Sequence, residues 1–216
     1  MDMFSTAAAY FHKGGYVMYV LLLCSIFVVT IAVERARFFA RADAGRAFGR
    51  KFCEAMGQGE YDVAQSMAGS ASGMLPEILT GVFHLALGKG KGLSAFLEVQ
   101  SGIAISQLRR RLYYLNVIVT LSPLLGLLGT IIGMISAFSV FNLDSGQATA
   151  ITGGVGEALI ATAFGLCVAI LALVVHSYFT QRIENIVTDM EQCFSLMEEH
   201  QDELRQSLRA EDGAGA

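Results

Sequence analysis

A single acidic residue stands at the head of a long apolar run. Glu157 follows the glycine-rich stretch 153–156 and directly precedes Ala158, where the run begins. An ionisable side chain inside a membrane span is costly and is usually placed for a function. The alternative is an acid in the first turn of a helix, wetted by the interface. A helix that begins at Ala158 leaves Glu157 interfacial, whereas one that begins near Asp144 or Ser145 brings it roughly 18 Å further in.

Two threonines accompany this acid within apolar runs, Thr130 in the second run and Thr162 in the third. A threonine in a membrane helix commonly bonds its own backbone carbonyl one turn back, so a structural role is the default expectation. Glu157 is the only acid that could lie inside a span. A proton path across the membrane would therefore need water or a titratable group from another chain.

The composition and the apolar runs predict an all-α integral membrane protein. Apolar residues make up 54% and charged residues 16%, against about 45–50% and about 25% in soluble domains. Three runs, 16–33, 115–141 and 158–179, are long enough to be transmembrane helices. Glu34 and Arg35 follow the first run at once, so we interpret it as a retained span and not as a cleaved signal peptide.

The basic residues predict the orientation. They gather after the first run, before the second and after the third, which places the N-terminus outside and the C-terminus in the cytoplasm. The predicted organisation is therefore an outer segment 1–15, a cytoplasmic helical loop 34–114, a short outer loop or start of the third helix at 142–157, and a cytoplasmic C-terminal helix and tail at 180–216.

Glycine breaks divide the cytoplasmic loop into expected helices at 34–56 and 60–68, and from Pro76 to about Leu87. Between Leu93 and Phe141 there is no break except Gly102 and features within the span. We therefore expect the second transmembrane helix to extend into the cytoplasm. The third is expected to do the same, because 181–208 keeps helical spacing.

Small residues recur at three- and four-residue spacing in both the second and the third span, so each helix has a small face that allows close helix packing. These faces could pack within one chain or between subunits, and the sequence favours neither. Their members are Gly126, Gly129, Gly133, Ala137, Ala158, Ala161, Gly165 and Ala169.

Other kinds of chemistry find no support in the sequence. The net charge is −4 and no basic, aromatic-interleaved patch is present, so nucleic acid is not expected as a partner. The four cysteines form no CxxC pair and the histidines are far apart, so no metal or cofactor is expected. No catalytic constellation suggests an enzyme.

Two motifs resemble the MotA/TolQ/ExbB proton-channel family. The first is the stretch 121–138, LSPLLGLLGTIIGMISAF, and the second is 156–166, GEALIATAFGL. The three-span arrangement with a long first cytoplasmic loop is also similar, so the resemblance covers essentially the whole chain. Three spans favour an ExbB or TolQ type over MotA, which resembles a four-span version, and we favour ExbB.

The resemblance implies a pentameric channel in the bacterial inner membrane, with Thr130, Glu157 and Thr162 as pore-lining polar residues. It implies a single-span partner of the ExbD/TolR type, which supplies an essential aspartate, and a TonB- or TolA-like protein that carries the work of the proton motive force to the outer membrane. Beside an ExbB-like motor subunit, the alternatives are a TolQ-like subunit of a Tol-Pal-type complex, a passive oligomeric scaffold and an autonomous ion channel.

Overall fold

The computed structural model describes residues 15–87, 92–141 and 148–214, and every element in them is an α-helix. The segment expected at 1–15 therefore lies almost entirely outside the described residues, whereas of the segment 142–157 the part 148–157 is described. The chain divides into two compact units. We call 1–34 with 111–178 the membrane unit, and 35–110 with 179–216 the polar unit.

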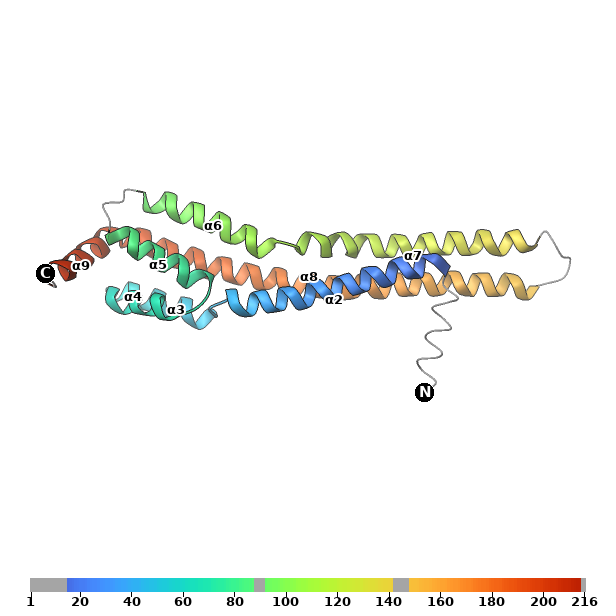
Figure 1. Cartoon of the computed structure of the whole chain (residues 1–216), viewed down its shortest axis with the longest axis horizontal. Helices are drawn as coiled ribbons and strands as arrows, with labels where there is room; N and C mark the ends of the chain where they lie inside the picture. Colours follow the sequence, from blue (N-terminus) through green and yellow to red (C-terminus); the bar gives the residue numbers. More distant parts are fainter. Residues whose placement is uncertain (1–14, 88–91, 142–147, 215–216) are drawn as a thin grey trace, which may run out of the picture. The chain divides into compact units, whose positions relative to one another are not determined.

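The membrane unit is built from parts of α2 (Gly15–Ala42) and α8 (Ala148–Glu199) together with α7 (Leu112–Phe141). α7 and α8 lie side by side and α2 packs against them (Figure 1). These helices share a buried cluster of Val28, Ile31, Leu115, Ile118, Val168 and Ala172.

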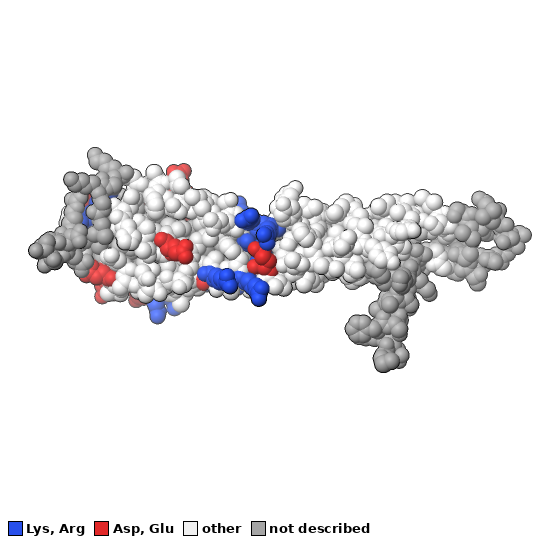
Figure 2. Space-filling model, in the orientation of Figure 1, with Lys and Arg blue, Asp and Glu red and all other residues white. Residues whose placement is uncertain are grey.

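Three helices in the described part of the chain are long and apolar enough to cross a membrane, as predicted. Only 28%, 28% and 33% of their most apolar windows are buried, so most of their apolar side chains face outward, where lipid or another chain would cover them. Figure 2 shows the described surface over these apolar helices as largely free of charged residues.

The third helix runs far beyond its apolar run. α8 has 52 residues and is therefore about 78 Å long, more than twice the hydrocarbon thickness of about 30 Å. We therefore expect the part after Phe179 to lie outside the bilayer. At its other end α8 begins at Ala148, close to the earlier of the two possible starts, so Glu157 belongs to the helix interior and not to its first turn.

The helix that contains the second span is interrupted on its N-terminal side, and its extension into the cytoplasm stays a prediction. α6 (Leu93–Arg109) ends before Arg110, and Arg111 adopts a left-handed conformation with φ 69° before α7 begins. Arg111 forms a 3.0 Å ion pair with Glu34. The buried guanidinium of Arg35 donates to the carbonyl oxygens of Leu108 and of Gln107, the latter at 3.2 Å. A side chain from another helix thus satisfies carbonyl groups at the end of α6. No glycine or proline is present at the break.

The polar unit contains α6, α3 (Arg46–Gly57), α4 (Tyr61–Ser70), α5 (Met74–Leu87), α9 (Gln201–Ala214) and the ends of α2 and α8. α5 contacts α4, α6 and α9. The helix expected at 60–68 corresponds to α4, and Pro76 lies in the first turn of α5 as predicted.

The single pattern expected at 34–56 is divided between two helices, because the chain turns between Ala42 and Arg46. Asp43 accepts a 2.8 Å hydrogen bond from the amide of Gly45, which has φ 83°. The same carboxylate pairs with Arg182 of α8 at 3.1 Å. One acidic side chain therefore both stabilises the turn and binds it to α8.

Candidate functional site, the α7–α8 helix pair

Glycines allow α7 and α8 to pack almost backbone to backbone. A Cβ added to Gly129 would lie 2.6 Å from the Cβ of Ala161, and one added to Gly133 would lie 3.0 Å from the Cβ of Ala158. These pairs show that the helices are antiparallel, since residue numbers fall on one helix as they rise on the other. Both distances are shorter than van der Waals contact, so a larger residue at either glycine would force the helices apart.

An equally close approach, made to backbone atoms, lies one turn further along the pair. A Cβ on Gly165 would lie 2.6 Å from the backbone oxygen of Ser122 and 3.0 Å from the Cα of Gly126. Both neighbours are backbone atoms, which cannot rotate away. Ser122 itself is fully buried and Ala169 is nearly so. Glycine is therefore required at Gly165 by the geometry of the helix pair.

The two threonines hydrogen-bond differently. The hydroxyl of Thr130 donates to the carbonyl oxygen of Leu127 in its own helix at 2.6 Å, which is the default expected for a membrane threonine. The hydroxyl of Thr162 instead donates across the helix pair to the carbonyl oxygen of Gly126 at 3.1 Å. Because Gly126 has no side chain, the hydroxyl of α8 can reach the backbone of α7.

The three polar residues proposed from the sequence lie at neighbouring levels of this pair. Thr162 is level with Gly126, Glu157 is adjacent to Ala158 and hence close to the level of Gly133, and Thr130 lies between these levels. Along α8 the five residues from Glu157 to Thr162 span about 8 Å. The structure describes the backbone of Glu157 but not its side chain. Among the described residues of the membrane unit, only Glu34, Arg111 and Glu157 carry a formal charge.

One residue of the contact was missed in the sequence. A Cβ on Gly154 would lie 2.6 Å from the Cβ of Ala137, so the small face of α8 begins a turn before Ala158. The signal was present, because Gly154, Ala158 and Gly165 share helical spacing. Gly154 was not included in the small face because the apolar run was expected to start at Ala158, since glycine and threonine lower the hydropathy of 148–157.

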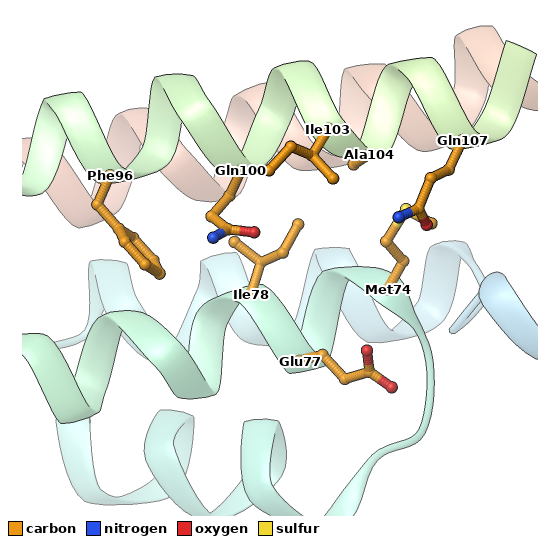
Figure 3. A pocket seen from close by; sticks show the side chains of 8 residues that line it. All are labelled: Met74, Glu77, Ile78, Phe96, Gln100, Ile103, Ala104 and Gln107. Carbon is orange, nitrogen blue, oxygen red and sulfur yellow. The ribbon is translucent and has the colours of Figure 1, made fainter.

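The polar unit has a groove of about 240 Å³ between α5 and α6. Figure 3 shows Gln100 of α6 opposite Ile78 of α5, and Gln107 of α6 above Met74 of α5. Among the described residues that line it, Glu77 is the only ionisable one, and a lone carboxyl offers no general acid–base pair. Within the described ranges, no group of three His, Cys, Asp or Glu residues could hold a metal ion.

Three apolar helices, two of them packed through small residues, and a polar helical unit define a polytopic α-helical membrane protein. The chain belongs to the MotA/TolQ/ExbB proton channel family, whose model matches residues 77–192. The match includes α7, all three polar residues and the long third helix as far as Gln192. Proteins of this family are channel and transport subunits, not enzymes.

Individual relatives agree with this assignment. The biopolymer transport protein ExbB-like 1 of Synechocystis is 33% identical over 183 residues, which cover 76% of this chain and 67% of the relative. The Tol-Pal system protein TolQ of Haemophilus influenzae is 34% identical over 46% of this chain and 44% of its own. The biopolymer transport protein ExbB of Neisseria gonorrhoeae is also 34% identical, over 46% of this chain and 47% of its own.

Proposed function

We propose that this chain is a proton-channel subunit of a bacterial inner-membrane energy-transducing complex, and that it acts as an ExbB-like protein that couples the proton motive force to outer-membrane transport. The observation that carries the proposal is the family match across a helix pair in which Glu157, Thr130 and Thr162 lie at neighbouring levels. The proposed orientation, with the N-terminus outside and the polar unit in the cytoplasm, rests on the arginines that flank the spans.

The hydrogen bonds of the two threonines suit a cationic species. Both hydroxyl protons are donated to backbone carbonyls, so each oxygen retains only its acceptor capacity. Acceptor oxygens stabilise water chains that carry an excess proton and do not stabilise anions. We therefore propose that Thr130 and Thr162 supply acceptors along a proton path that Glu157 gates.

The depths of Thr162 and Glu157 in the membrane support different roles for the two residues. If the hydrocarbon core begins at Leu115, eleven residues place Gly126 and Thr162 about 16 Å in, near the middle of a core of about 30 Å. Eighteen residues place Gly133, and with it Glu157, about 27 Å in, near the outer boundary. A carboxylate there can exchange protons with outside water, whereas the middle of the span contains only hydroxyls.

A path with one acid near its entrance needs a second titratable group deeper in the membrane. We propose that a single-span ExbD/TolR-like partner supplies it, that the chain forms a homopentamer around this partner, and that a TonB/TolA-like protein receives the work. The proposed small-residue faces, which pack α7 on α8 within one chain, leave the outward apolar faces of these helices for lipid and for neighbouring subunits.

Glu157→Gln tests the proposal most directly. The chain is co-expressed with a candidate single-span partner that carries an aspartate, and the purified complex is weighed by native mass spectrometry and reconstituted for dye-based proton flux. We expect the Gln variant to assemble normally but to lose most of the flux. Glu98→Gln, which neutralises an exposed acid of α6, is the matched control. Wild-type flux in Glu157→Gln would remove Glu157 from the mechanism.

A TolQ-like subunit is the second candidate, and the equal 34% identities to a TolQ and an ExbB support keeping it. Rescue of strains that lack one or the other protein separates the two functions. A passive scaffold predicts a different pattern: Gly129→Leu would disrupt assembly while Glu157→Gln and Thr162→Val would leave activity unchanged.

A further inference from the structure

Two cysteines that are distant in the sequence meet in the polar unit. Cys53 of α3 and Cys193 of α8 are separated by 140 residues, and their Sγ atoms lie 3.4 Å apart. The other two cysteines, Cys24 and Cys167, belong to the membrane unit. Because Cys193 lies fourteen residues beyond Phe179, this pair is outside the membrane span.

The surroundings of the pair hold the two sulfurs in place. Cys193 is fully buried, and its Sγ lies 3.8 Å from the carbonyl oxygen of Gly49 in α3. A Cβ on Gly49 would lie 3.3 Å from the Cβ of Asp189, so α3 and α8 approach closely one turn from the cysteines. The sulfurs need to move together by only about 1.4 Å to reach the disulfide length of about 2.05 Å.

Cys53 is accessible from outside, whereas Cys193 is not. Cys53 is half-buried and lines an open pocket of about 490 Å³ between α3 and α8. Arg46 and Arg50 line the same pocket. A small oxidant can therefore reach Cys53 first, which leaves the buried Cys193 as the second, resolving thiol.

We propose that Cys53 and Cys193 form a disulfide site, and that a peroxide closes it so that α3 becomes covalently tied to α8. Nothing about the proton path is required for this inference. In the proposed cytoplasmic location the pair is reduced at rest, because disulfides there are transient and serve in redox sensing.

The reaction balances with a peroxide as the oxidant. The thiolate of Cys53 attacks one peroxide oxygen, the O–O bond breaks, and Cys53 becomes a sulfenic acid with release of hydroxide. The thiol of Cys193 then attacks the sulfenyl sulfur; the S–S bond forms, the S–O bond breaks, and one water leaves with the proton of Cys193. Two electrons pass from the thiols to the peroxide.

The electrostatics of the pair agree with this order of events. The hydrogen bond with Cys193 lowers the pKa of the Cys53 thiol, although burial and the Asp189 carboxylate oppose the shift. The same hydrogen bond, together with burial, raises the pKa of Cys193. Cys53 is thus the better nucleophile toward a peroxide, since the thiolate is the reactive form.

The test uses the full-length chain in detergent, both as the wild type and as the Cys24→Ser/Cys167→Ser variant, which retains only the pair. Each is treated with hydrogen peroxide and digested without reduction for mass spectrometry. We expect a cross-linked peptide pair that contains Cys53 and Cys193, about 2 Da lighter than the two peptides together. We also expect a melting temperature about 5–10 °C higher that returns to its starting value with dithiothreitol.

Cys53→Ser in the same background is the matched control: burial should protect Cys193 from the peroxide, so it should remain a free thiol that is alkylated once the chain is denatured. The proposal is overturned if the wild type and the two-cysteine variant give sulfinic acid at Cys53 without the cross-linked peptide, or if bridges form only between separate chains. The wild-type peptide map decides the question even if a substituted chain folds poorly.

Discussion

The hydroxyl of Thr162 on α8 lies 3.1 Å from the carbonyl oxygen of Gly126 on α7, to which it donates a hydrogen bond. Threonine can reach across because a Cβ on Gly126 would lie only 3.1 Å from the Cα of Thr162. Gly126 and Thr162 therefore both pack closely and share a hydrogen bond in the middle of a predicted span. A change on either side should disturb both.

The first prediction concerns this hydrogen bond. Thr162→Val preserves the shape of the side chain but removes its hydroxyl, which should cost about 0.5–1.5 kcal/mol of stability and should reduce proton flux in the reconstituted complex. Thr162→Ser retains a donor and should keep most of the flux. Equal flux from the Val and Ser variants would show that the hydroxyl takes no part in transport.

The second prediction concerns the contact between Gly165 and the backbone of α7. Gly165→Ala places a methyl group against the backbone of Ser122 and Gly126, so we expect a loss of about 1–3 kcal/mol and a lower melting temperature. Gly153→Ala is the matched control, because a Cβ there meets nothing within 4 Å. Its higher helix propensity should make it neutral or stabilising by up to about 1 kcal/mol. Equal melting temperatures for the two variants would contradict the observed packing.

A third prediction tests the buried arginine that ends α6. Arg35 is 1% exposed, and its guanidinium carbon lies 4.4 Å from the ring centre of Phe38 and 5.0 Å from that of Phe39. Arg35→Met should lose about 2–4 kcal/mol, because the carbonyls of Gln107 and Leu108 lose their charged donor. Arg35→Lys should not rescue this loss, since an ammonium lacks the planar fork.

Arg37→Met controls for the removal of one positive charge, because Arg37 is exposed and lies two residues away on the same helix. Its melting temperature should stay within the error of the wild type. If Arg35→Met and Arg37→Met melt alike, Arg35 does not hold the end of α6.

The fourth prediction concerns pH. Burial raises the pKa of the Asp189 carboxyl, and Arg46 only partly offsets this effect. A raised pKa in the folded state favours the protonated form, so the stability it contributes is present at acid pH and is lost as pH rises through the folded pKa. Asp189→Asn should therefore melt higher than the wild type at pH 7 and should match it near pH 3.

Thermal melts between pH 3 and pH 7 measure the difference, with Glu184→Gln, which changes an exposed acid, as the control. An advantage of Asp189→Asn that is the same at both pH values would contradict the linkage.

Much of the fold could be predicted because its signals are local. The three spans follow from apolar runs whose length matches the bilayer, and the small faces of α7 and α8 follow from residue types that recur at helical spacing. The break before α7 could not be predicted, because Arg110 and Arg111 are ordinary helix formers. It exists because Glu34 and Arg35, some 75 residues earlier, bind that part of the chain.

The cysteines show the same division. In the sequence Cys53 and Cys193 are isolated residues without a CxxC spacing, so nothing local to either residue indicates that they meet. Their contact arises only because α3 packs against the extension of α8. Glu157 lies between these cases: the sequence identifies it as unusual, and the start of α8 at Ala148 decides that it belongs to the interior of a helix.

The sequence alone thus determined the number of membrane helices, their small faces and the family, because hydropathy, residue size and motif spacing are properties of contiguous residues. The tertiary structure decided which carbonyl Thr162 binds, where α6 ends and which thiols meet. Each of these depends on two segments that approach within a few ångströms, and no local pattern in a single chain encodes that distance.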